Sequence, residues 1–226
     1  MNVITVIIAD DHPLVRKALR NELSEVGDFE VLAEASDGLE AVKLATKLKP
    51  DVVVMDIGLP ELNGIEATRR IKTVRPKTIV LVLTVYDDTE HLLGILESGA
   101  DGYLTKTVMV EDIIQAIHSV AAGQTVLSPH IFQKVLKCAL RHSYKVVSID
   151  SQTRLTTREL EILQLIGRGL GNKQIACELD LSIRTIKSHL IDIFSKLKVS
   201  SRTAAVITAL RCGFIKAADL DLSGLK

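Results

Sequence analysis

Five polar residues of types that handle phosphate lie at the ends of apolar runs in the first half of the chain: Asp10, Asp11, Asp56, Thr84 and Lys106. Three carboxylates form a hard oxygen site suited to Mg²⁺, and one of them can also act as a nucleophile toward phosphorus. A lysine ammonium can neutralise charge on a transferring phosphoryl group, and a threonine hydroxyl can donate to one of its oxygens. These residue types predict phosphoryl chemistry if the fold brings them together.

The elements that must position these residues follow a regular alternation. Short β-rich runs alternate with stretches of helical period such as LVRKALRNELSEV, and the runs are VITVII, EVLAEA, DVVVMD, IVLVLT and GYLTK. Connections of helix length cannot form hairpins, and continuously apolar strands need cover on both faces. The pattern predicts an α/β doubly wound fold with a five-stranded parallel sheet. Ligands of such sheets bind at the carboxyl ends of the strands, where all five polar residues lie.

Each of these residues also has an ordinary structural interpretation. Asp11 could cap the helix that Pro13 opens, Asp56 could start the turn IGLP, and Thr84 could cap a helix. The same coincidence at several strand ends favours a shared site. Two adjacent carboxylates repel each other and resist burial, so we expect Asp10 and Asp11 to hold a cation.

The first half resembles the receiver domain of bacterial two-component response regulators, which have a flavodoxin-like fold. The resemblance covers residues 1–122 and rests on the pair DD, on MDIGLPELNG with Pro60 and Gly64, on LT at Thr84 and on GADGYLTK. It implies that Asp56 accepts a phosphoryl group from a sensor histidine kinase. It also implies an Mg²⁺ site made by these groups: Asp10, Asp11, Asp56 and the Gly58 carbonyl.

Tyr103 and two departures from the receiver pattern bear on the switch. The resemblance implies that Thr84 and Tyr103 are switch residues, with the Tyr103 rotamer reporting phosphorylation, although a buried aromatic can equally be core. Thr107 follows Lys106 where many receivers have a proline after a cis bond. A cis bond before a non-proline residue costs about 2.5–4 kcal/mol, so we expect a trans bond. Gly58 has no side chain to steer water during dephosphorylation, which leaves the phosphate lifetime open.

Composition divides the chain into an acidic half and a basic half. The 226 residues, 47% of them hydrophobic, are enough for two ordinary domains. Residues 1–122 hold 12 Lys and Arg against 20 Asp and Glu, whereas residues 123–226 hold 16 against 8. The asymmetry predicts that the second half meets a polyanion and that the first handles something cationic.

Two further features concern location and redox state. The apolar runs are short and interrupted by charge, and Asp10 comes too early for a signal peptide, so we expect a cytoplasmic protein that does not contact a membrane. Three widely spaced cysteines, Cys138, Cys177 and Cys212, lie in apolar helical contexts. We interpret them as buried thiols, not as disulfides or zinc ligands.

The sequence of the second half predicts a linker over residues 123–152, which contains a short helix, HIFQKVLKCALRH. It predicts a small all-α four-helix domain over residues 153–226. The first helix of this domain has Leu160, Leu163 and Ile166 on one face and ends at Gly169. NKQIACELD forms the second helix. The third begins after Ser182 as N-cap, and the fourth follows Ser201.

The third helix has a core face and a polar face. Its predicted core residues are Ile186, Leu190, Ile193 and Leu197, and the opposite face carries Arg184, Lys187, Ser188 and Ile191. Two helices joined by a tight turn, the second with a basic face, describe a helix-turn-helix whose second helix enters the DNA major groove. The alternative is a merely solvated face, but five basic residues against one acidic residue between Ser182 and Arg202 favour phosphate contacts. Ile191 can meet a thymine methyl group.

Residues from LTTRELEIL to SSRTAA resemble the LuxR/NarL-type DNA-binding domain, so the whole chain resembles a NarL/FixJ-family response regulator. The resemblance implies binding to double-stranded promoter DNA as a homodimer that forms on phosphorylation, with the helix TAAVITALRCGF as a candidate dimer seam. RNA polymerase is a further candidate partner. The implied base contacts are Lys187, Ser188 and Ile191, and the implied phosphate contacts are Arg184, Lys196, Lys198 and Arg202. His189 suits helix packing or phosphate, not a metal site.

Two other classes of protein share some of these features. A haloacid dehalogenase-type phosphohydrolase needs a second carboxylate two residues after its nucleophile, where this chain has Gly58, so we expect no enzyme. A phosphorylation-independent DNA-binding regulator with a non-signalling receiver is the stronger alternative. The retained residues Asp10, Asp11, Asp56, Thr84 and Lys106 speak against it. The cognate kinase, the promoters and the direction of regulation stay open.

Overall fold

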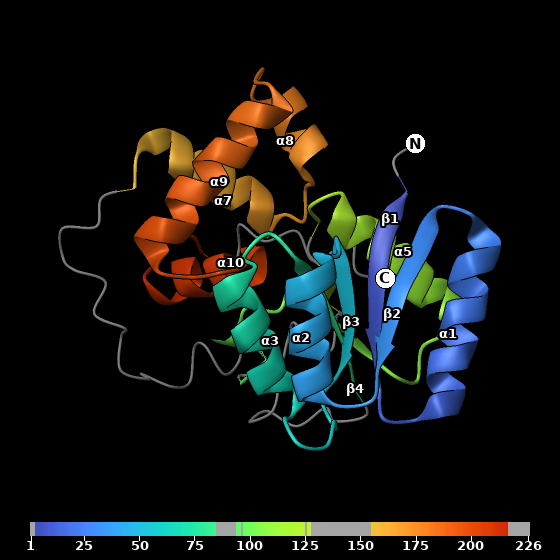
Figure 1. Cartoon of the computed structure of the whole chain (residues 1–226). Helices are drawn as coiled ribbons and strands as arrows, with labels where there is room; N and C mark the ends of the chain where they lie inside the picture. Colours follow the sequence, from blue (N-terminus) through green and yellow to red (C-terminus); the bar gives the residue numbers. More distant parts are fainter. Residues whose placement is uncertain (1–2, 85–93, 96, 125, 128–154, 217–226) are drawn as a thin grey trace. The chain divides into compact units, whose positions relative to one another are not determined.

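The computed structural model describes residues 3–84, 94–95, 97–124, 126–127 and 155–216 (Figure 1). The chain forms two compact units, residues 1–121 and 122–226. The linker helix predicted from HIFQKVLKCALRH, with Cys138, lies outside the described residues. Within the described ranges, no helix is long and apolar enough to cross a membrane.

A parallel sheet forms the centre of the first unit. Its strands lie in the order β2-β1-β3-β4-β5-β6, and every pair with a described register is parallel. The five predicted strands are present as β1 (Ile4–Ala9), β2 (Phe29–Ala35), β3 (Val52–Asp56), β4 (Ile79–Thr84) and β5 (Gly102–Thr105). A sixth strand, β6 (Val126–Leu127), was not predicted, because two residues are too few to show a periodicity.

Helices cover both faces of this sheet. α1 (Pro13–Val26) and α5 (Val110–Ala121) contact each other on one face, whereas α2 (Gly38–Leu48) and α3 (Gly64–Val74) pack together on the other (Figure 1). Local sequence starts two of these helices, because the Asp37 and Asn63 side chains accept hydrogen bonds from the backbone N–H groups of Glu40 and Glu66. The α/β doubly wound fold is as predicted.

Burial of the strands explains their continuously apolar sequences. The side chains of Val6 to Ile8 and of Val52 to Met55 are buried, and so are those of Val80 to Leu83. A strand that contacts helices on both faces has no solvent side, so it does not alternate apolar and polar residues.

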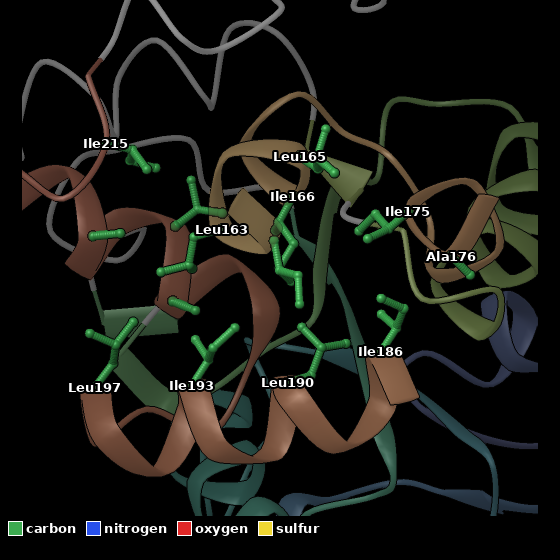
Figure 2. Close-up of a cluster of buried hydrophobic side chains, with 14 residues drawn as sticks. Leu163, Leu165, Ile166, Ile175, Ala176, Ile186, Leu190, Ile193, Leu197 and Ile215 are labelled. Carbon is green, nitrogen blue, oxygen red and sulfur yellow. The ribbon is translucent and has the colours of Figure 1, made fainter. Parts of the chain in front are cut away.

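Residues 155–216 of the second unit form four helices: α7 (Thr157–Gly167), α8 (Asn172–Glu178), α9 (Ile183–Leu197) and α10 (Arg202–Arg211). Ser182 caps α9 as predicted, since its hydroxyl accepts a hydrogen bond from Thr185 N. Figure 2 shows the core, in which Ile186, Leu190, Ile193 and Leu197 point from α9 toward the other helices. Leu163 and Ile166 of α7 are also buried as predicted, whereas Leu160 is only half-buried.

The prediction that the cysteines are buried thiols is wrong for both described ones. Cys177 is exposed and Cys212 is half-exposed, and both are free. On α8 the buried face consists of Ile175 and Ala176, which leaves Cys177 on the solvent side of this short helix. Apolar neighbours in the sequence did not distinguish the two faces.

Candidate functional site

The carboxyl ends of the strands bring the predicted phosphate-handling residues to one edge of the sheet. Asp10 directly follows β1, Asp56 ends β3, Thr84 ends β4 and Lys106 directly follows β5. The register pairs Asp56 with Leu83 and Thr84 with Thr105, so these strand ends are level with one another. The parallel sheet thus produces the convergence that the sequence predicted.

The ammonium group of Lys106 bridges two buried carboxylates. Its Nζ atom lies 2.6 Å from Asp10 Oδ2 and 2.8 Å from Asp56 Oδ2. The Asp10 and Asp56 side chains are only 3% and 8% exposed, so water screens their charges poorly. Burial by itself lowers the pKa of Lys106, but hydrogen bonds to Asp10 and Asp56 and their negative charges outweigh it, and the pKa lies above its ordinary value.

Backbone geometry holds the Asp56 carboxylate in place. Its Oδ1 accepts a hydrogen bond of 2.8 Å from the N–H of Ile57. Gly64 N donates to the Ile57 carbonyl over 3.0 Å, and a Cβ at Gly64 would lie 1.9 Å from the Asp56 carbonyl oxygen. Only a glycine lets α3 begin this close to Asp56. A Cβ at Gly58 would lie 3.7 Å from Asp56 Oδ2, which places the Gly58 backbone beside the carboxylate.

Asp10 and Asp11 differ in their surroundings. Asp10 Oδ1 accepts a hydrogen bond of 2.9 Å from His12 N, whereas the Asp11 side chain is partly exposed. Asp11 Oδ1 is a buried atom without a hydrogen bond of good geometry, and it faces His12 Nδ1 at 2.5 Å. Possible ligand atoms of Asp10, Asp11 and His12 all lie within 4.8 Å of one another. The N-cap of α1 is His12, so the alternative that Asp11 caps this helix is wrong.

Thr84 and Tyr103 are both buried, the latter with 1% exposure. The burial of Tyr103 fits its core interpretation, and its role as a switch stays a prediction. Lys106 N donates to the Thr84 carbonyl over 2.7 Å, which ties the two strand ends together. No cis peptide bond occurs among the described residues, so the bond before Thr107 is trans as expected. The region after Thr84, where it could cap a helix, lies outside the described residues.

Two residues near the edge were missed by sequence reasoning. Arg16 donates from Nη1 to the Asp10 carbonyl over 2.6 Å and from Nε to Glu34 over 3.2 Å. His12 lies beside the carboxylates of both Asp10 and Asp11. Both follow the acidic pair closely in the sequence, and that proximity was the available signal.

The second candidate site is the outer face of α9. Arg184, Lys187, Ser188 and Ile191 are all exposed, as predicted for the face of this helix outside the core. The turn before α9 runs from Leu179 to Ser182, and Asp180 adopts a positive φ of 51° within it. Arg158 of α7 donates to the Leu179 carbonyl over 2.7 Å and so holds the turn against the first helix. Two helices joined by a turn of this length make a helix-turn-helix.

Comparison with known families matches both units. Residues 6–118 match the response regulator receiver domain, and residues 153–209 match the luxR family of bacterial regulatory proteins. The chain belongs to the LuxR-type response regulators. This response regulator is 42% identical to the transcriptional regulatory protein LiaR of Bacillus subtilis (strain 168), over 92% of this chain and 98% of LiaR. It is 37% identical to the response regulator protein VraR of Staphylococcus aureus, over 94% of this chain and 99% of VraR.

Solved structures of response regulators share the fold. The response regulator ChrA of a heme-sensing two-component system matches with a TM-score of 0.51 and 37% identity, over 95% of this chain and all of ChrA. RcsB of Salmonella typhimurium matches with a TM-score of 0.55 and 27% identity, over 94% of this chain and all of that chain.

Two predicted phosphate contacts of this response regulator are engaged inside their own domain. Lys196 lies 2.7 Å from both carboxylate oxygens of the buried Glu159, so its charge is neutralised there. Arg202 is buried and donates to Asn172 Oδ1 over 3.0 Å and to the Leu170 carbonyl, and burial lowers its pKa to about 10. These internal contacts compete with DNA for both side chains, and a phosphate contact by Lys196 or Arg202 stays a prediction. Arg184 and Lys198 are exposed, and His189 is half-buried.

Proposed function

We propose that this response regulator accepts a phosphoryl group on Asp56 and in that state binds promoter DNA through α9. The observation that carries the first part is the contact of Lys106 with both Asp10 and Asp56. A buried carboxylate held beside a fixed cation is a suitable acceptor for an anionic group. The donor is a phosphohistidine of a sensor histidine kinase, in keeping with the family.

The transfer requires one bond to form and one to break. A carboxylate oxygen of Asp56 attacks phosphorus, and the phosphorus–nitrogen bond breaks with its electron pair leaving on the imidazole, which takes up a proton. Lys106 reduces the negative charge around the transferring group. We propose that the Thr84 hydroxyl donates a hydrogen bond to one phosphoryl oxygen. We also propose that Thr84 and Tyr103 act as switch residues.

The carboxylates fit Mg²⁺, which prefers oxygen ligands. Asp11 offers a buried oxygen whose close neighbour is His12 Nδ1, and Asp10 next to it accepts a hydrogen bond from His12 N. Asp10, Asp11, Asp56 and the Gly58 carbonyl would hold the ion, which when bound offsets charge on the phosphoryl oxygens. His12 offers nitrogen, a poorer donor for so hard an ion.

Intact mass spectrometry after incubation with acetyl phosphate and MgCl₂ tests the acceptor. The wild type gains one phosphoryl group and Asp56→Asn gains none, because the amide is not a nucleophile. Asp28→Asn is the matched control, since this aspartate precedes β2 and takes no part in the site. A phosphoryl gain in Asp56→Asn would show that the assignment is wrong. If the wild type gains no phosphoryl group and still binds DNA normally, the result would support the phosphorylation-independent alternative.

For DNA, we assign Lys187, Ser188 and Ile191 to base edges and Arg184 and Lys198 to phosphates. Two copies of the domain bind an inverted repeat, since two-fold symmetric proteins meet two-fold symmetric sites. α10 buries most of its residues in its own domain, which leaves Ala204, Thr208 and Arg211 as its outer face for a dimer seam.

Phosphorylation raises the population of the DNA-competent dimer. The factor is limited by how much phosphorylation changes the free-energy difference between two receiver states. Sedimentation and operator binding, each with and without acetyl phosphate, measure this coupling in the wild type and in Asp56→Asn. Equal dimerisation and equal affinity in all four samples would contradict it. RNA polymerase is the further partner that a transcription regulator bound at a promoter would meet.

A further inference from the structure

Two large apolar side chains of the DNA-binding domain are exposed on the same helix. Between residues 155 and 216, all of which the structure describes, Ile183 is 44% exposed and Ile191 is 64% exposed, and both belong to α9. Single exposed apolar residues are common on protein surfaces. Two on one helix leave apolar surface in contact with water at two places on it, which calls for a partner that covers them.

These isoleucines flank a lysine at regular spacing. Ile183, Lys187 and Ile191 follow one another at intervals of four residues, so they form one stripe along the helix. Eight residues of α-helix rise about 12 Å, which separates the two isoleucines by that length along the axis. Figure 2 shows the core residues Ile186, Leu190 and Ile193 pointing from α9 into the domain. Ile183, three residues before Ile186, lies at the exposed N-terminal edge of this core face, and the stripe turns away from the core toward Ile191.

The charge around the stripe indicates what covers it. Residues 155–216 contain ten basic and five acidic residues. Arg184, Lys187 and Lys198 are exposed on or next to α9, and Asp192 is the acidic residue of this helix. A polyanion with apolar groups at regular intervals complements such a surface, and the major groove of DNA presents phosphates on its rims and thymine methyl groups on its floor.

We propose that Ile183 contacts a thymine methyl group and that Ile191 contacts a second one on the other side of the base pair that Lys187 reads. The proposal rests on the proposed function, in which α9 lies in the major groove, and it adds Ile183 as a specificity-determining residue. Lysine pairs with guanine O6 and N7, whereas an isoleucine side chain complements the C5-methyl group of thymine. The half-site therefore contains two thymines within about four base pairs of each other, since successive base pairs rise 3.4 Å.

Replacement of single thymines by deoxyuridine tests the contacts, because it removes only the methyl group. The DNA is the sequence that the full-length, acetyl phosphate-treated protein enriches from a random pool. Affinity is measured for the wild type, Ile183→Ala, Ile183→Val and Ile191→Ala. Val74→Ala is the matched control, since Val74 is 55% exposed on α3 of the other unit.

The wild type and the Val74→Ala control lose about fourfold in affinity at two thymines of the half-site, which corresponds to about 0.8 kcal/mol per methyl group. Ile183→Ala loses the sensitivity at one of these thymines and keeps it at the other, and Ile191→Ala shows the reverse. Ile183→Val keeps both. A purely structural role of Ile183 would lower affinity for every DNA alike and leave both deoxyuridine effects intact.

Persistence of both effects in Ile183→Ala, or the absence of any sensitive thymine in an enriched site, would overturn this proposal while the proposed function stands. Failure to enrich any sequence would instead contradict the proposed DNA binding, and the inference with it. Thermal unfolding of each variant shows whether the domain is intact, and Ile183→Val supplies the comparison if Ile183→Ala is unstable.

Discussion

Lys106 Nζ lies 2.6 Å from Asp10 Oδ2 and 2.8 Å from Asp56 Oδ2, so one cation neutralises two carboxylates from different strands. This relationship joins the ends of β1, β3 and β5. Loss of the cation would leave two buried carboxylates together, which is more costly than loss of an exposed ion pair.

Lys106→Met is therefore expected to lower the free energy of unfolding of the receiver by about 1.5–3 kcal/mol at pH 8. The pKa of Lys106 is raised in the folded state, so its contribution is present below its ordinary pKa of about 10.4 and is lost as the pH rises through the folded value. Urea unfolding of wild type and variant from about pH 8 to 11 measures the difference. A constant difference across this range would contradict the assignment.

Mg²⁺ is expected to stabilise the receiver through the carboxylate cluster. At a Mg²⁺ concentration 100 times the Kd, binding to the folded state contributes about 2.7 kcal/mol. Asp11→Asn removes one charged ligand and is expected to abolish most of this gain, because a neutral amide oxygen attracts the ion far less than a carboxylate does. Thermal unfolding with MgCl₂ or with EDTA checks the effect, and Asp28→Asn should respond as the wild type does. Equal stabilisation of Asp11→Asn and the control would place the ion elsewhere.

Gly64 and Gly58 offer a matched pair of substitutions beside Asp56. Gly64→Ala puts a Cβ 1.9 Å from the Asp56 carbonyl oxygen, which forces the backbone apart and is expected to cost about 3 kcal/mol of stability and slow phosphorylation. Gly58→Ala puts a Cβ at an ordinary 3.7 Å from Asp56 Oδ2, so it is expected to fold normally. Urea unfolding and phosphorylation rates of both variants give the comparison. Similar behaviour of the two would mean that α3 can move away from Asp56 at little cost.

The pair of Glu159 and Lys196 makes the DNA-binding domain sensitive to acid. Burial raises the pKa of Glu159, but hydrogen bonds from Lys196 and Thr156 outweigh it, and the pKa lies below its ordinary value. Its stabilising contribution is present above the unfolded pKa of about 4.3 and is lost as the pH falls through the folded value. Lys196→Met is expected to cost about 1–3 kcal/mol at pH 7 and to lose less stability on acidification. Calorimetry between about pH 3 and 7 tests this, and parallel curves would contradict it.

Lys187 and Lys198 should differ in how they affect DNA binding. Lys187→Ala is expected to cost about 1–3 kcal/mol on the specific site and to relax the preference at one position of the half-site. Lys198→Ala should weaken all sequences alike and reduce the slope of log K against log salt by about one unit. Binding to the site and to scrambled DNA at several salt concentrations separates the two. Unchanged affinity of Lys187→Ala for both DNAs would show that this face of α9 does not enter the groove.

The fold and the phosphoryl site were largely predictable from the sequence because both depend on short-range patterns. Apolar runs joined by helical stretches require a parallel sheet, and a parallel sheet necessarily brings Asp10, Asp56 and Lys106 to one edge. Helical periodicity likewise identified the core and outer faces of α9, since side chains on a helix alternate with a known period.

Partners across the fold were decided only by the tertiary structure. Charge counting treated Lys196 and Arg202 like Lys198, but Glu159 lies 37 residues before Lys196 and Leu170 lies 32 residues before Arg202. A sequence pattern reports which way a side chain leaves its own helix, whereas burial and pairing depend on what other helices place opposite it. For the same reason the sequence alone determined that α9 has a basic outer face, and packing decided that Lys196 of α9 pairs with Glu159, that Arg202 of α10 is buried and that Ile183 is left exposed.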